Sequence, residues 1–172
     1  MKNLKFSRLF AAALVVACLA LTGCKPETEE VLVEKVSIVR PVDSSDKIIG
    51  NWRGQEYSDK FEITTSNYNN YYSYNGDVLY YTTNNLYIRE IDETSGYVYS
   101  QFYDGDKIGY NATVGQWYAI YYFDLTEDAV KISQAAGPKG GCDTLKEVVE
   151  EFTVELGYMS EQEGKYSTCS RE

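Results

Sequence analysis

The stretch Gln116-Trp-Tyr-Ala-Ile-Tyr-Tyr-Phe-Asp-Leu125 decides the fold class of this chain. It contains no glycine or proline, and most of its side chains are aromatic or aliphatic, which is typical of a buried β-strand. Gly115 precedes the stretch and Thr126-Glu127-Asp128 follows it, so turn residues bound it at both ends. The chain therefore contains at least one strand that is apolar on both faces.

Segments of the same kind lie on both sides of this stretch. Tyrosine, valine, isoleucine and threonine are frequent in them, and these residues favour strands. Turn signals separate them, among them Asn75-Gly76-Asp77, Asn84-Asn85 and Asp104-Gly105-Asp106. We predict strands at Ile48–Tyr57, Lys60–Ser66, Tyr71–Tyr74 with Val78–Thr83, Leu86–Glu93, Gly96–Tyr103, Lys107–Val114, Gln116–Leu125 and Ala129–Ala135.

Short connections between successive strands favour antiparallel neighbours, and therefore a meander. A meander of about eight strands closes most simply into an up-and-down barrel. Closure also removes exposed strand edges, which are prone to aggregation. The predicted fold class is all-β, an antiparallel barrel of about eight strands with a C-terminal α-helix.

Both faces of several predicted strands carry large side chains. In the first stretch, Tyr118 and Tyr122 alternate with Trp117 and Tyr121. A barrel in water would alternate apolar with polar residues, but a tyrosine ring favours burial while its hydroxyl favours water. Three interpretations remain open. The lumen is an aromatic pocket, the outer tyrosines form a contact surface, or one set fills the barrel while the other only covers its surface.

The C-terminal part has a helical pattern. Thr144-Leu145-Lys146-Glu147 fits a capping box, in which the threonine caps the helix and the glutamate bonds back. An apolar stripe with helical spacing follows, made of Leu145, Val148, Val149 and Phe152. We predict a helix that packs on the barrel as a lid or brace; a partner-binding helix is the alternative.

The first 24 residues indicate export. A basic segment at residues 1–8 precedes Leu9–Leu21, an apolar run of 13 residues. This run is shorter than the roughly 20 residues that span a bilayer, and it fits a signal peptide. Leu21-Thr22-Gly23-Cys24 resembles the bacterial lipobox, which implies that Cys24 is lipidated and becomes the mature N-terminus; the alternative is an ordinary secretory peptide. Lys25 follows, and by the same resemblance this favours the outer membrane, on its periplasmic or its surface face.

Three regions follow from these patterns. We predict a signal peptide at 1–23, a lipidated N-terminus and tether at 24–46, and the barrel with its helix at 47–172. After removal of the signal peptide two cysteines remain besides Cys24, and an exported protein favours their pairing. We therefore predict a structural disulfide between Cys142 and Cys169; two free thiols are the alternative.

Composition excludes several classes of function. The mature part would have 149 residues, 13 basic and 26 acidic, and a net charge of −13, which disfavours binding to nucleic acid. The chain has no histidine, so catalytic pairs and metal sites that need histidine are excluded. Asp104-Gly105-Asp106 supplies too few oxygens for calcium and fits a turn better. We predict no metal, no cofactor and no enzymatic activity.

Gly50-Asn51-Trp52 resembles the Gly-x-Trp signature of lipocalins, whose tryptophan packs at the closed end of the barrel. Lipocalins usually also carry an arginine late in the chain that lies over this tryptophan. This chain departs from that pattern, because no arginine lies between Arg89 and Arg171. Over residues 48–158 it is similar to uncharacterised bacterial lipoproteins with a lipocalin-like β-barrel domain. The segments that carry this likeness are Gly115–Tyr122, Leu125–Thr126, Val130–Ser133 and Thr144–Thr153. The resemblance implies a lipocalin-like barrel and an envelope location, without a known activity.

Two functions remain open. The first is a membrane-anchored protein that binds a small apolar or aromatic-stacking ligand in its barrel. The predicted ligand-binding residues are Trp52, Phe61, Ile63, Tyr99, Tyr110 and Tyr121. The second is an interaction or adhesion module whose exposed tyrosines contact a protein or glycan. The two functions differ in where they place a group of five tyrosines. If these side chains are exposed they favour the second function, and if they are buried they favour the first: Tyr71, Tyr72, Tyr74, Tyr80 and Tyr81.

Overall fold

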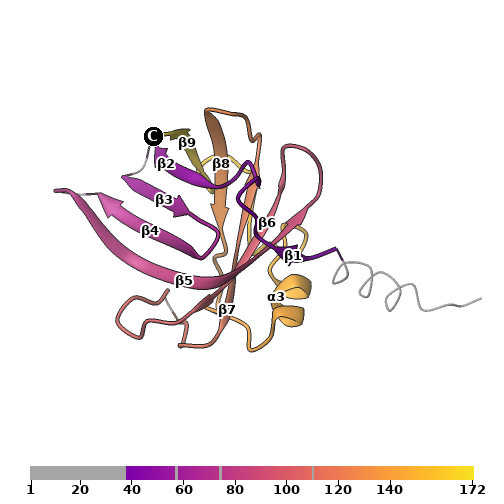
Figure 1. Ribbon diagram of the computed structural model, residues 1–172. Helices are drawn as coiled ribbons and strands as arrows, with labels where there is room; N and C mark the ends of the chain where they lie inside the picture. Colours follow the sequence, from indigo (N-terminus) through magenta and orange to yellow (C-terminus); the bar gives the residue numbers. More distant parts are fainter. Residues whose placement is uncertain (1–37, 57, 74, 110) are drawn as a thin grey trace, which may run out of the picture. The chain divides into compact units, whose positions relative to one another are not determined.

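The computed structural model describes residues 38–172 except residues 57, 74 and 110 (Figure 1). The predicted signal peptide, the lipidation site at Cys24 and most of the predicted tether lie outside the described residues, and so does Tyr110.

The described residues form one antiparallel sheet that closes on itself (Figure 1). Its spatial order is β1-β5-β4-β3-β2-β9-β8-β7-β6, and the additional pairing of β5 with β6 closes an eight-stranded barrel of β2 to β9. The fold class predicted from the sequence, an all-β lipocalin-like antiparallel barrel with a helix near the C-terminus, is confirmed. The elements are β1 (Arg40–Pro41), β2 (Gly50–Gly54), β3 (Asp59–Ile63), β4 (Asn67–Ser73), β5 (Asp77–Glu90), β6 (Gly96–Phe102), β7 (Trp117–Phe123), β8 (Ala129–Gln134), α3 (Leu145–Glu151) and β9 (Ser167–Arg171).

Three strand predictions are wrong. The Asn84-Asn85 pair is not a turn between strands: Asn85 has a φ of 52°, and the pairing with β6 shifts register there, so the pair bends one long strand, β5. Residues 107–109 and 111–114 form bends, turns and irregular loop instead of a strand. Strand β9, which the sequence pattern does not indicate, pairs with both β8 and β2 and completes the barrel between them.

The register identifies the inner wall of the barrel. Tyr81 on β5 contacts the ring of Tyr118 on β7, two strands away, and its hydroxyl donates a hydrogen bond to Gln134 on β8. Strand alternation then places Ile120 and Tyr122 on the inner face with Tyr118. Their neighbours on β7, Ala119 and Tyr121 among them, lie on the outer face.

A covering segment explains why both faces of β6 and β7 are apolar. The chain between β8 and β9, residues 135–166, contains α3 and lies against the outside of these two strands (Figure 1). Tyr97 accepts a hydrogen bond from the Val154 backbone N–H at 3.3 Å, and Tyr121 donates one to Glu161 at 2.7 Å. The outer tyrosines here are therefore buried against the covering segment, so they are not a free contact surface.

Helix α3 forms as its sequence predicts. The Glu147 backbone N–H donates to Thr144 Oγ1 at 3.2 Å, and Glu147 Oε2 accepts from the Thr144 backbone N–H at 3.2 Å, which completes the capping box. Val148, Val149 and Phe152 are buried. The helix braces the outer side of the barrel, and β9 follows it, so it is not the last element.

Residues 38–49 form a lead-in segment that closes one end of the barrel. Arg40 pairs with Ile88 through β1, and Ile48 is fully buried and accepts a hydrogen bond from Trp52 Nε1 at 2.8 Å. This segment is part of the folded body, whereas the domain predicted from the sequence begins at Lys47. We call this the lead-in end of the barrel.

Arg171 supplies the late arginine that the sequence analysis judged missing. Its guanidinium lies 4.1 Å from the centre of the Trp52 ring and donates hydrogen bonds to the carbonyls of Lys47 and Ile49, each at 2.8 Å. The prediction failed because β9, which carries Arg171, was not recognised as a strand. The tryptophan and arginine together fix the lead-in segment onto the barrel.

The predicted disulfide is wrong, because Cys142 and Cys169 are both free and buried. Cys142 pairs with Trp117, the first residue of β7. Cys169 pairs with Val130, which lies one residue beyond the level of Phe123 at the other end of β7. Six residues of strand correspond to about 20 Å, whereas a disulfide needs Cα atoms within about 7 Å.

Candidate functional site

The structure separates the predicted ligand-binding residues into two groups. Trp52, Phe61 and Ile63 lie on the inner face and are buried. Tyr99 and Tyr121 lie on the outer face under the covering segment, so their placement in the lumen is corrected. The sequence does not show which face of β6 and β7 points into the barrel, because both faces of these strands carry aromatic rings.

Aromatic rings in mutual contact fill the middle of the barrel. Tyr68 stacks on Phe61 with centroids 6.4 Å apart, and Tyr81 contacts Tyr68, Phe102 and Tyr118 at 5.6 to 5.8 Å. The Tyr68 and Tyr81 hydroxyls are hydrogen bonded at 2.9 Å, and burial raises the pKa of both phenols well above the ordinary value. Contacts of this kind give the middle of the barrel the character of a packed core.

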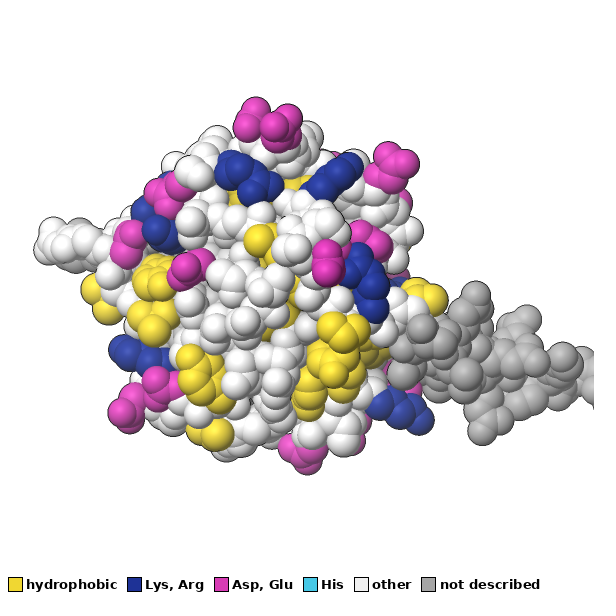
Figure 2. Space-filling model, in the orientation of Figure 1, with side chains coloured by type: hydrophobic (Ala, Val, Ile, Leu, Met, Phe, Trp, Pro, Cys, Tyr) yellow, Lys and Arg dark blue, Asp and Glu magenta, His cyan; other side chains and the backbone are white. Residues whose placement is uncertain are grey.

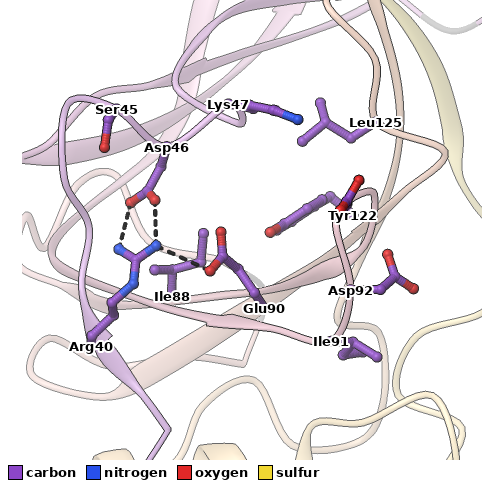
Figure 3. A pocket seen from close by; sticks show the side chains of 11 residues that line it. Arg40, Ser45, Asp46, Lys47, Ile88, Glu90, Ile91, Asp92, Tyr122 and Leu125 are labelled. Carbon is purple, nitrogen blue, oxygen red and sulfur yellow. Dashed lines mark hydrogen bonds and ion pairs between the residues drawn. The ribbon is translucent and has the colours of Figure 1, made fainter.

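A pocket of about 500 Å³ lies at the lead-in end (Figure 3). Its lining comes from three segments that are distant in the sequence: the lead-in segment, the end of β5 with the hairpin that follows it, and the end of β7. The lining residues are Arg40, Ser45, Asp46, Lys47, Ile88, Glu90, Ile91, Asp92, Glu93, Tyr122 and Leu125. Of the six residues predicted from the sequence, the five that the structure describes are not among them.

The Arg40–Asp46 ion pair forms one wall of this pocket. Arg40 donates to the two carboxylate oxygens of Asp46 at 2.9 and 2.5 Å, and the Asp43 backbone N–H donates to Asp46 at 2.7 Å. Only 4% of the Asp46 side chain is exposed. Burial alone would raise the pKa of this carboxyl, but the hydrogen bonds from Arg40 and Asp43 outweigh it and hold the pKa below its ordinary value.

Tyr122 supplies the inner wall. Its side chain is 3% exposed, and Figure 3 shows the ring lying across the pocket with its hydroxyl directed toward Glu90. Burial is the main cause that raises the pKa of this phenol, and the negative charges of Glu90 and Asp46 raise it further. No hydrogen bond joins the hydroxyl to any residue that the structure describes, so it is available to a ligand.

Gly96 makes room for that hydroxyl. A Cβ at this position would lie 2.6 Å from Tyr122 Oη and 2.6 Å from the Arg89 carbonyl oxygen. Gly96 pairs with Glu90 on one side and with Tyr122 on the other, and it follows the hairpin that Asp92 organises. Asp92 accepts hydrogen bonds from the backbone N–H and hydroxyl of Thr94 and from the Ser95 hydroxyl at 2.7 to 2.9 Å. These bonds hold the rim of the pocket in place and lower the pKa of Asp92.

Charge in the pocket is mixed and on balance negative. Arg40 and Lys47 are positive, whereas Asp46, Glu90, Asp92 and Glu93 are negative. Arg40 Nη2 lies 3.3 Å from Glu90 Oε2 but is already bonded to Asp46, so Glu90 is only partly neutralised. Ile88 and Leu125 provide a buried apolar floor.

Exposed apolar side chains mark the opposite end of the barrel. Tyr72 and Val78 face each other across the β4–β5 hairpin and are 53% and 60% exposed, and Tyr80 is 53% exposed. Figure 2 shows apolar atoms at the surface beside this hairpin, at the left of the view. Tyr81 is buried and Tyr71 half-buried, donating to Glu62 at 2.9 Å, while Tyr74 lies outside the described residues. The tyrosines of this hairpin are therefore divided between the two roles.

Neither a metal-binding cluster among the described residues nor a similar known protein indicates a particular reaction. Over the described part of the chain, no group of three acidic or cysteine side chains is placed to hold a metal ion. None of the helices among those residues is both long and apolar enough to cross a membrane. Comparison with protein-family models, curated proteins and solved structures gave no match.

Sequence reasoning missed the pocket because its residues have separate local explanations. Residues 41–46 indicate only a turn, and Glu90 is simply an acid near the end of a predicted strand. One signal was present in the sequence: Glu90 has the same alternation parity as Ile88, which places a carboxylate on the inner face of a barrel strand.

Proposed function

We propose that this protein is a non-catalytic binding protein of the bacterial cell envelope, anchored by a lipid on Cys24, that holds a small molecule in the pocket at its lead-in end. One observation carries the binding proposal: the pocket of about 500 Å³ that contains Tyr122 and Glu90. Its volume falls within the range of about 300 to 1,000 Å³ that is usual for ligand pockets. The proposed site lies at the end of the barrel because aromatic rings occupy its middle.

The lining of the pocket also has the composition of a binding site. Ile88 and Leu125 offer apolar contact, and Tyr122 offers a ring together with an unpaired hydroxyl. Ligand sites combine mainly apolar walls with a few polar groups that fix orientation. The Arg40–Asp46 pair and the Asp92 turn hold this lining in place, which lowers the entropy cost of binding.

The binding proposal is tested on the full-length protein in lipid nanodiscs, with empty nanodiscs as the blank. A panel of small amines, alcohols and carboxylates is screened by saturation-transfer NMR, and titrations of the hits follow. We expect saturable one-to-one binding. Ile91→Trp, at the exposed rim of the pocket, should weaken binding at least tenfold, while the control Leu156→Trp, at a similarly exposed aliphatic residue after α3, should leave it unchanged. Binding that ignores Ile91→Trp would place the ligand elsewhere.

The lipid anchor rests on Leu21-Thr22-Gly23-Cys24 and is tested separately. Growth of an expressing bacterium with an alkyne-tagged fatty acid should label the protein, and Cys24→Ala should abolish the label. Labelling that persists in Cys24→Ala would remove the anchor from the proposal without affecting the pocket.

The exposed side chains at the opposite end favour a second candidate, an interaction module that contacts a protein or glycan. Tyr72, Val78 and Tyr80 present apolar surface next to one another on a single hairpin. Tyrosine is common at protein interfaces because its ring is apolar and its hydroxyl can still bond. A glycan array probed with the full-length protein tests this candidate, and the double variant Tyr72→Ser/Tyr80→Ser should lose any signal that depends on the hairpin.

A further inference from the structure

We propose that the pocket at the lead-in end selects an organic cation, a small primary amine with an apolar group, whose ammonium lies between Glu90 and the Tyr122 hydroxyl. This inference rests on the proposed function and names the class of ligand. It is carried by three features of the pocket: the balance of charge, the two acceptors Glu90 and Tyr122, and the apolar floor.

The charge balance favours a cation. Four acidic and two basic side chains line the pocket, a formal charge of −2. Arg40 offers little to an incoming anion, because both of its Nη atoms bond to Asp46. Lys47 is exposed at the rim and is the group that opposes a cation there. An anion in the centre of the pocket would face Glu90 at short range, and this like-charge contact disfavours it.

The acceptors next to the floor match an ammonium group. Glu90 shares its inner-face parity with Ile88, and among the described residues its one ion pair is the 3.3 Å contact with Arg40. Tyr122, 3% exposed, turns its unpaired hydroxyl toward the same carboxylate (Figure 3). An ammonium donates up to three hydrogen bonds and accepts none, so it can bond to a carboxylate and a phenol oxygen together. The Tyr122 ring adds a π face, which also attracts cations.

An organic amine fits this pocket better than a metal ion. Divalent calcium needs six to eight oxygen ligands, and no group of three metal-binding side chains is found in the described residues. The apolar floor of Ile88 and Leu125, extended at the rim by Ile91, would be left without a partner by a hydrated ion. A hydrocarbon or aryl group attached to the ammonium covers it instead.

Three ligands of nearly equal shape test the inference by calorimetry on the full-length protein in nanodiscs. They are 2-phenylethylamine, the neutral 2-phenylethanol and the anionic 3-phenylpropanoate. We expect the amine to bind at least about tenfold more tightly than the alcohol, because only the amine brings a positive charge to Glu90, and we expect the carboxylate to bind weakest. Added salt should weaken amine binding and leave the alcohol unaffected.

Two variants locate the selectivity. Glu90→Gln keeps the shape of the side chain but removes its charge, and it should erase most of the preference for the amine over the alcohol. Glu127→Gln, an exposed acid in the β7–β8 hairpin at the same end of the barrel, should change nothing. Equal binding of amine and alcohol, or a preference that survives Glu90→Gln, would overturn the cation assignment and leave the proposed function intact. Failure of all three ligands and of the screening panel would overturn both.

Discussion

Substitution of Asp46 by asparagine perturbs the closure of the lead-in end, because the carboxylate of Asp46 ties this segment together. The carboxylate accepts two hydrogen bonds from Arg40 and one from the Asp43 backbone N–H, at 2.5 to 2.9 Å, and its side chain is 4% exposed. Asparagine retains one acceptor oxygen but turns an amide N–H toward a donor. The substitution therefore removes the charge and at least one bond.

The expected cost follows from these contacts. Hydrogen bonds to charged groups contribute about 1.5 to 3 kcal/mol each, but the Arg40 side chain is 43% exposed, so water replaces part of what it loses. We expect Asp46→Asn to lower the free energy of unfolding by about 2 to 3 kcal/mol at pH 7. Asp128→Asn, an exposed acid with no side-chain bond to the described residues, should change it by less than about 0.5 kcal/mol.

Urea unfolding followed by tryptophan fluorescence measures both variants over a range of pH. The folded pKa of Asp46 is lower than the unfolded value of about 3.9, so the pair contributes fully above that value. Its contribution is lost as the pH falls below about 3.9 through the folded pKa. The difference between wild type and Asp46→Asn should therefore shrink in acid. A difference below about 0.5 kcal/mol at pH 7, or one that grows in acid, would refute the role assigned to the pair.

Three further predictions concern the same barrel. Gly96→Ala should lower the free energy of unfolding by about 1 to 3 kcal/mol, because its Cβ would lie 2.6 Å from Tyr122 Oη and 2.6 Å from the Arg89 carbonyl oxygen. The control Gly105→Ala, whose Cβ would have its closest contact at 3.7 Å, should be nearly neutral, and equal effects of the two variants in urea unfolding would contradict this packing. Arg171→Ala should lower the free energy of unfolding by about 2 to 4 kcal/mol, because it removes the stack on Trp52 and the hydrogen bonds to the Lys47 and Ile49 carbonyls. It should also broaden the NMR signals of the lead-in segment. A stable variant with unchanged spectra would contradict the role of Arg171 in fixing this segment. Cys142 and Cys169 should both react with a thiol reagent once the protein is unfolded without reductant. In the folded protein they should react slowly, because burial raises the pKa of Cys142 to about 11 and that of Cys169 to about 12. A protein that is not labelled after unfolding and whose mass is about two daltons lower would show that the two cysteines are bridged.

The sequence predicts the fold class well because the barrel depends on many short, turn-bounded aromatic segments. The capping box at Thr144 is a local pattern, and it is confirmed by its hydrogen bonds. In contrast, β9 is five residues with polar side chains at its ends, so its local pattern is weak, and pairing with β8 and β2 decides its structure.

Tertiary contacts decide the remaining differences. The prediction that Tyr99 and Tyr121 line the lumen rests on an assumed strand parity, which rings on both faces leave undetermined, and the covering segment buries the outer face as well. The pocket combines residues 40–47 with Glu90 and Tyr122, and no local pattern links positions so far apart in the chain. A site assembled by closure of a barrel end is visible only when strand parity and the course of the lead-in segment are both known.

Occupation of the pocket at the lead-in end by a small ligand is tested by intermolecular NOEs from a bound ligand of the panel. We expect contacts from the ligand protons to the Ile88 and Leu125 methyl groups and to the Tyr122 ring. Contacts to Tyr81 and Phe102 in the middle of the barrel, or to Tyr72 and Tyr80 at the opposite end, would contradict it.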